Sequence, residues 1–164
     1  MEPTSRQWCP GSTVSSETLS PLHSTKYRLD LVWSWTYALS VAMPLAPQVQ
    51  EWLRSLDVVD RAEVVSALRY LEQFGRSAVE PDVKHRIQTS AYYPDMSEVR
   101  VTLGPQRVYR VLVCFGPADR LVGLIGGNKA GVGNAWYLQA VPAADVVFAQ
   151  YLAATGQTKE RDGR

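Results

Sequence analysis

The sequence has little of what metal-dependent and nucleophilic enzymes use. Its 164 residues include only two cysteines and two histidines, and they hold no CxxC, no HExxH and no cluster of histidines with carboxylates. These absences exclude the common zinc motifs. No Ser–His–Asp set can be argued from His23 and His85. The glycine-rich residues 126–131 lack the GxxxxGK[ST] spacing of a phosphate loop. We therefore expect no metal and no cofactor.

Long apolar runs are absent as well. No stretch approaches the roughly 18 apolar residues that a membrane span needs, and residues 1–25 have no apolar stretch behind a basic start, as a signal peptide would. Cys9 and Cys114 lie far apart, so we expect no disulfide between them and a buried Cys114 within a strand. The sequence thus predicts a reduced, cytoplasmic protein without a membrane partner.

Charge is present in both signs but is unevenly distributed. The net charge is +1, yet residues 48–82 hold four arginines against seven acids, whereas residues 84–129 hold seven lysines and arginines against three acids. One interpretation is scatter over a small protein. The other is a basic sheet face for a polyanion, with acidic helices behind it.

Pattern along the chain divides it into three parts. Residues 1–30 are rich in Ser, Thr and Pro and predict a loosely ordered extension, residues 31–155 predict the folded domain, and residues 156–164 predict a polar tail. Residues 28–43 have strand-like content and predict the first strand of a sheet.

Helical spacing and turn signals give the order of the elements. Residues 48–56 and 61–74 have apolar positions three and four apart, with Asp60 as a candidate N-cap and Gly75 as a natural helix end. Residues 78–96 read as a long loop. Three strands follow, at 97–103, 107–115 and 121–125, and Pro142 opens a final helix over 143–154. We expect an α+β fold with the helices against one face of a mostly antiparallel sheet of three to four strands: two N-terminal helices and a C-terminal helix.

The hairpin predicted for residues 97–115 carries the chemistry. If Gly104, Pro105 and Gln106 form its loop, Leu103 faces Arg107, Val101 faces Tyr109, and Arg100 faces Arg110. Like charges directly opposite destabilise a hairpin. A site for an anion would favour the pair, because the guanidinium fork matches phosphate oxygens.

Several short motifs occur in a characteristic order: VQEWLRSL at 49–56, Phe74-Gly75, the lysine of Asp82-Val83-Lys84, MSEVR at 96–100, YRVL at 109–112, GNKAG at 127–131 with Trp136-Tyr137, and VPAAD at 141–145. Together they cover about 120 residues, from Trp35 to Ala154. This segment resembles the RelE/HigB superfamily of type II toxins, in its phage-derived, HigB-like branch.

The resemblance implies a small toxin that cleaves mRNA in the ribosomal A site and is neutralised by an antitoxin, often one with a helix-turn-helix domain. By position, Arg100 and Arg110 grip the scissile phosphate, Lys129 is a further cation, and Tyr137 stacks or transfers a proton. Contacts with RNA and the ribosome are assigned to Lys84, His85, Arg86, Arg107 and Tyr109. His85 is also a candidate for protonation.

Two departures from the family pattern bear on activity. Asn128 stands where an acidic residue is common, which removes a carboxylate useful for acid–base work, and Val99 stands where leucine is usual. The alternatives are a toxin-fold protein without nuclease activity, either a gyrase poison or an antitoxin-binding remnant, and a small α+β domain whose basic face contacts nucleic acid weakly.

Overall fold

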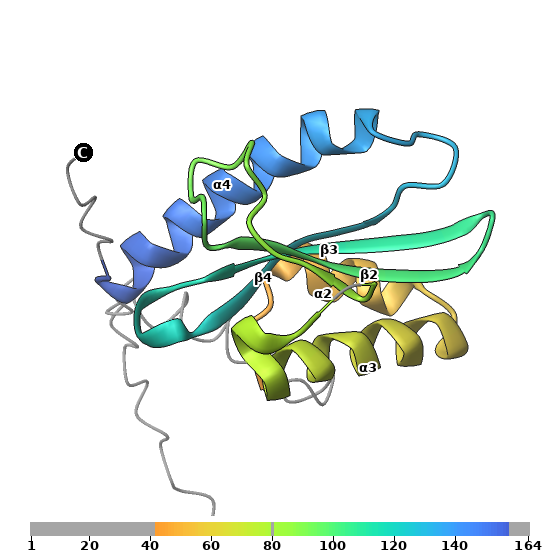
Figure 1. The fold of residues 1–164 in the computed structure, drawn as a ribbon, viewed down its shortest axis with the longest axis horizontal. Coiled ribbons are helices and arrows are strands. Elements are labelled where there is room, and N and C mark those ends of the chain that lie inside the picture. Colours follow the sequence, from red (N-terminus) through yellow and green to blue (C-terminus); the bar gives the residue numbers. More distant parts are fainter. Residues whose placement is uncertain (1–41, 80, 158–164) are drawn as a thin grey trace, which may run out of the picture.

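The computed structural model describes residues 42–79 and 81–157 as an antiparallel sheet with helices on both faces (Figure 1). Four strands lie in the order β1-β2-β3-β4. The elements, with their bounds, are α2 (Pro47–Ser55), α3 (Val58–Phe74), β1 (Val83–Lys84), β2 (Met96–Gly104), β3 (Arg107–Phe115), β4 (Leu121–Asn128) and α4 (Ala135–Thr155). Short 3-10 turns follow α3 at Gly75–Ser77 and β3 at Pro117–Asp119. The α+β prediction is confirmed.

The helices occupy both faces of the sheet, so the expectation that they share one face is wrong. In Figure 1, α2 and α3 lie below the sheet and α4 lies above it. Two apolar clusters reflect this. Val99, Val111 and Val113 pack with α2 and α3, whereas Leu112 and Val122 pack with α4. Side chains on a strand alternate between faces, and β3 therefore contributes to both clusters.

The two N-terminal helices lie close to their predicted positions, but the second starts earlier. The Asp57 carboxylate accepts hydrogen bonds from the backbone N–H groups of Val59 and Asp60, so Asp57 is the N-cap and not Asp60. These backbone bonds lower the pKa of Asp57. At the other end Gly75 closes the helix with a positive φ of 53°, as predicted.

The first strand of the sheet comes from an unexpected part of the chain. Residues 78–96, predicted to be loop, supply the two-residue β1, which pairs with Glu98 and Val99 of β2. The strand predicted for residues 28–43 lies almost wholly outside the described residues. Just after it, Leu45 forms a parallel bridge with Gly123 of β4.

The final helix starts at Ala135 and not near residue 143, and it runs through Pro142. An internal proline removes one helical hydrogen bond. Packing outweighs this cost, because Ala140, Val141 and Ala144 are buried against β3 and β4 around the proline. No described helix is both long enough and apolar enough to span a bilayer.

The β2–β3 hairpin has the predicted register over most of its length. Arg100 pairs with Arg110 and Val101 pairs with Tyr109. A bulge near the tip places Gly104 opposite Arg107, so the predicted pairing of Leu103 with Arg107 is wrong. Cys114, at the other end of β3, is buried as expected, and burial raises the pKa of its thiol.

Asp60 joins α3 to the hairpin. Its carboxylate is 2% exposed and accepts hydrogen bonds from Tyr109 Oη at 2.5 Å and from Arg107 at 3.0 Å. The bond to Asp60, together with burial, raises the pKa of Tyr109 to about 12. Asp60 is thus a structural anchor for the hairpin.

The substitution Tyr109→Phe is expected to lower the free energy of unfolding by about 1–3 kcal/mol at pH 8, because Asp60 loses a buried donor. The folded-state pKa of Tyr109 lies above that of a free tyrosine, so the wild-type advantage is complete below pH 10 and is lost as pH rises to about 12. Urea denaturation of both proteins at pH 8 and pH 11.5 measures this. An equal difference in the free energy of unfolding between the two proteins at both pH values would contradict the role given to the Tyr109–Asp60 hydrogen bond.

Candidate functional site

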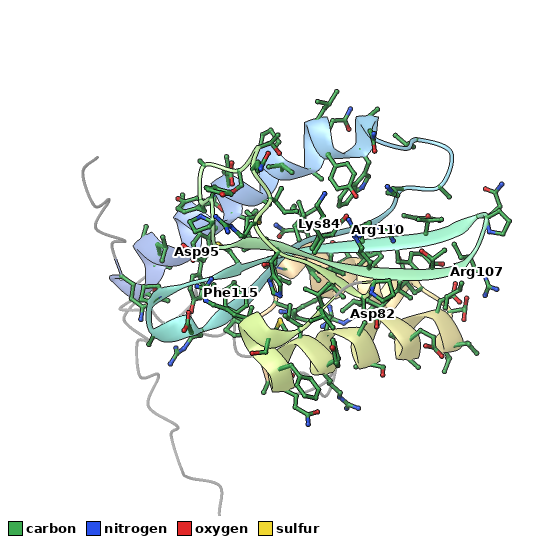
Figure 2. All side chains as sticks on the ribbon, viewed as in Figure 1. Asp82, Lys84, Asp95, Arg107, Arg110 and Phe115 are labelled. Carbon is green, nitrogen blue, oxygen red and sulfur yellow. The ribbon has the colours of Figure 1, made fainter. Side chains whose placement is uncertain are left out.

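The face of the hairpin that lies toward α4 carries an acid and two arginines. Glu98 and Arg100 are two residues apart on β2, and Arg110 lies opposite Arg100 on β3, so all three side chains share one face. Figure 2 shows Arg110 and Lys84 on this side of the sheet, whereas Asp82 lies toward α3. The register therefore brings the two predicted phosphate-binding arginines together.

The Glu98 carboxylate lies between the two arginines and is fully buried. Its Oε2 accepts a hydrogen bond from Arg100 Nε at 3.0 Å. Its Oε1 is in ion-pair contact with Arg110 Nε at 3.3 Å. This corrects the premise that the opposed arginines need an external anion: a shared carboxylate inside the protein already offsets their repulsion.

Lys129 and Tyr137 add to the group of side chains around Glu98. Lys129 directly follows β4, and its backbone N–H donates to the Val108 carbonyl at 2.9 Å. Its Nζ donates to the Tyr137 hydroxyl at 3.4 Å, and that hydroxyl donates to Glu98 Oε1 at 2.5 Å. Burial and the bond to Glu98 raise the pKa of Tyr137, so its hydroxyl stays protonated.

Four of these residues, Glu98, Arg100, Lys129 and Tyr137, line an open cavity of about 840 Å³, the cationic cavity. Arg110 lies behind Glu98, with a side chain 10% exposed, and is not among the residues that line it. Four cationic side chains and one carboxylate contribute to its wall: Lys84, Arg86, Arg100, Lys129 and Glu98. Tyr137, Tyr93 and Asn134 line it too. Cations outnumber the acid, and the cavity therefore has the charge and the hydrogen-bond donors to hold a phosphodiester.

His85 also borders the cavity, but both of its ring nitrogens are engaged within the protein. Nε2 lies 2.8 Å from the Ala78 carbonyl and Nδ1 lies 2.9 Å from Ser97 Oγ. Because a carbonyl only accepts, Nε2 carries a proton and donates it, and in the neutral ring Nδ1 accepts from the serine. His85 would have to break one of these bonds to move a proton for a substrate, so the geometry favours a structural role.

Two residues assigned to RNA contact lie elsewhere. Tyr109 is 6% exposed and belongs to the cluster beneath the sheet, so its assignment to a binding surface is wrong. Arg107 lies at the hairpin tip, away from Lys84 and Arg110, and pairs with Asp60 (Figure 2). By contrast Arg86 lines the cavity, where it donates to the Tyr93 hydroxyl at 2.8 Å.

Asn128 is a structural residue of the sheet end. Its side-chain oxygen accepts from the backbone N–H groups of Val108 and Ala130, and its amide donates to the Gln106 carbonyl. Glu98 is the one carboxylate residue among those that line the cavity. Sequence reasoning missed Glu98 as a site residue, although its same-face spacing with Arg100 was the available signal.

Comparison with known proteins gives the family. Residues 51–149 match the family described as "Phage derived protein Gp49-like (DUF891)". The chain belongs to this Gp49-like family. Every described side chain that lines the cationic cavity lies within the matched segment of this Gp49-like chain.

Two curated relatives come from Mycobacterium tuberculosis (strain ATCC 25618 / H37Rv). The chain is 32% identical over 114 residues to "Putative toxin HigB2" and, over the same length, 32% identical to "Putative toxin HigB3". In each case 70% of this chain is covered, with 56% of the first relative and 96% of the second. The chain thus spans just over half of the former. No solved structure matches it.

Within the described residues, no group of three or more His, Cys, Asp or Glu side chains is arranged to hold a metal ion. The donors that the Gp49-like chain does bring together include cationic nitrogens and the hydroxyls of Tyr93 and Tyr137, which suit an anionic ligand.

Proposed function

We propose that this Gp49-like protein is the toxin of a toxin–antitoxin system and that it cleaves mRNA on the ribosome. The observation that carries the proposal is the cationic cavity, in which a tyrosine hydroxyl lies between a lysine and a carboxylate. The names of the two relatives support the toxin assignment. The protein acts in the cytoplasm and is neutralised by a cognate antitoxin with a helix-turn-helix domain.

The proposed reaction uses the RNA itself as nucleophile. The 2′-oxygen attacks the adjacent phosphorus and releases its proton to water, and the bond to the 5′-oxygen breaks, which leaves a 2′,3′-cyclic phosphate and a 5′-hydroxyl end. Arg100 and Lys129 stabilise the charge that develops on the phosphate oxygens. Glu98 and the Tyr109 carbonyl, 2.7 Å from Arg110, keep the arginines in place.

Tyr137 is the proposed proton donor to the leaving oxygen, for which its hydroxyl turns from Glu98 Oε1 to the substrate. Its raised pKa makes it a weak acid, but an alkoxide leaving group is a far stronger base than its phenolate. Lys129 contacts the Tyr137 ring and hydroxyl and so stabilises the phenolate until water returns the proton. Lys84 and Arg86, at the cavity wall, contact the flanking RNA backbone.

Induction of the chain in a bacterial host without an antitoxin tests the proposal. We expect growth arrest together with new 5′-hydroxyl ends in mRNA, absent before induction and absent from the variant Arg100→Ala/Lys129→Ala. Arrested growth with intact mRNA and altered DNA supercoiling would instead favour the gyrase-poison alternative. Unchanged growth and unchanged mRNA ends would contradict the toxin assignment itself.

A further inference from the structure

The outer edge of β2 is open beyond its short partner strand. β1 pairs only with Glu98 and Val99, and the next contact on that side is the Arg100 N–H, which donates to the Asp82 carbonyl at 2.7 Å. Alternate residues of a strand present their backbone groups to the same edge, so the N–H and C=O of Thr102 point the same way. Thr102 is exposed and, within the described residues, no strand pairs with it on this outer edge, whereas Val108 of β3 pairs with it on the inner one.

A groove of about 350 Å³ runs beside this edge, between α3 and β2. Ala67 and Tyr70 of α3 line one wall, and Val101 and Leu103 of β2 line the other. These two strand residues lie two apart and both face α3. An added strand would place its own alternate side chains over the same groove, which fits an extended chain and not a helix.

The charge of the groove walls indicates which kind of molecule can bind there. Glu63 of α3 and Asp82, before β1, both line the groove and are exposed. Carboxylates on both walls repel a nucleic-acid backbone and attract lysine or arginine side chains. The combination of an open strand edge, apolar pockets and acidic walls matches an extended basic peptide with alternating apolar residues.

Arg100 connects the groove to the cationic cavity, because this residue lines both, while its side chain points to the cavity side of the sheet. A strand that ran along the β2 edge would lie against the residue proposed to hold the phosphate. Its own carbonyl or carboxylate groups would compete for the Arg100 guanidinium. Occupation of the groove would therefore reduce the affinity of the cavity for RNA without the occupant entering it.

We infer that an extended basic segment of the antitoxin binds this groove by adding a strand to the open edge of β2, and thereby inactivates the cationic cavity through Arg100. The inference rests on the proposed function, which supplies the partner. The backbone of Thr102 provides the hydrogen bonds, and Glu63 and Asp82 select the charge of the segment.

The test uses the full chain and, as probe, the purified protein encoded by the adjoining gene. Thr102→Pro removes the outward N–H and is expected to weaken binding by about 100-fold in titration calorimetry, whereas Thr102→Ala keeps the N–H and changes binding by less than about threefold. Circular dichroism and thermal melting report whether the proline variant folds. Hydrogen exchange on the wild-type complex, which needs no variant, should show new protection of the Thr102 amide.

A charge-reversing pair of variants tests the groove independently of the backbone. Glu63→Lys should weaken binding about tenfold, while Glu51→Lys, an exposed acid on α2, should leave it unchanged. The inference is overturned if Thr102→Pro and Glu63→Lys bind like the wild type, if protection appears only on α4, or if the adjoining protein does not bind. A chain that dimerises alone, and becomes monomeric as Thr102→Pro, would assign the edge to a second copy and also overturn it.

The outcomes separate this inference from the proposed function. Cleavage of mRNA by the free chain, with Thr102→Pro still neutralised at wild-type strength, leaves the function standing and rejects the groove. A complex that Thr102→Pro abolishes, formed by a chain that cleaves no mRNA, supports the groove and rejects the nuclease.

Discussion

Replacement of Glu98 by alanine is expected to lower the free energy of unfolding by about 3–5 kcal/mol, because it leaves Arg110 buried beside Arg100 without their shared counterion. Arg110 is nearly inaccessible to water, with a side chain 10% exposed, so hydration replaces little of what the carboxylate provides. Glu98 also accepts the Tyr137 hydroxyl, which loses its partner in the same variant. Chemical denaturation at pH 7 measures the change.

Two further variants test whether the lost charge of Glu98 causes the loss of stability. Glu98→Gln keeps an acceptor for Tyr137 but removes the charge, and we expect an intermediate loss. Glu51→Ala removes an exposed acid from α2 and should change stability by less than about 0.5 kcal/mol. A cost below about 1 kcal/mol for Glu98→Ala would show that the carboxylate does not hold the arginines.

The second large effect is expected on catalysis. Arg100→Ala should lower the rate of mRNA cleavage by about 10²–10³-fold, because a positioned cation is removed from the charge that develops in the transition state. Arg100 is partly exposed, with 26% of its side chain accessible, so the substitution is tolerated by the fold far better than loss of Glu98. Arg54→Ala, on α2 and away from the cavity, is the matched control.

The measurement for this variant is single-turnover cleavage of end-labelled mRNA on programmed ribosomes, at equal concentrations of folded protein. The cleavage rate of Arg100→Ala should be lower than that of the wild type by two or more orders of magnitude, while the rate of Arg54→Ala stays near the wild-type rate. Equal rates for all three proteins would remove Arg100 from the proposed mechanism.

Local sequence pattern predicts the hairpin chemistry because strand alternation and a tight turn leave few choices. The pairing of Arg100 with Arg110 follows from counting outward from the turn, and the bulge changes the register only at Gly104. The same alternation puts Glu98 on the face of Arg100. The sequence pattern does not indicate how deeply the two arginines are buried. They look like exposed cations until the position of α4 over this face of the sheet is known.

The position of α4 is the main feature that sequence reasoning lacked. Its apolar stripe indicates which side of the helix is buried, but not which face of the sheet the helix covers. Its true start, eight residues before the predicted one, is what brings Tyr137 to Glu98 and Lys129. Pro142 concealed that start, since proline usually opens a helix.

Long-range partners explain the other differences. Asp60 fits the pattern of an N-cap, but its actual partners, Tyr109 and Arg107, lie 49 and 47 residues away. The two-residue β1 has no pattern of its own and forms because β2 offers an edge. Tyr109 is a candidate for RNA contact until its burial and its bond to Asp60 are known.

The most direct test of the central claim is to incubate the purified chain with ribosomes carrying a defined mRNA and to identify the ends of the fragments. We expect a 5′-hydroxyl on one fragment and a 2′,3′-cyclic phosphate on the other, and we expect neither end with Arg100→Ala/Lys129→Ala. Intact mRNA with the wild-type chain, or equal cleavage by the double variant, would contradict the central claim.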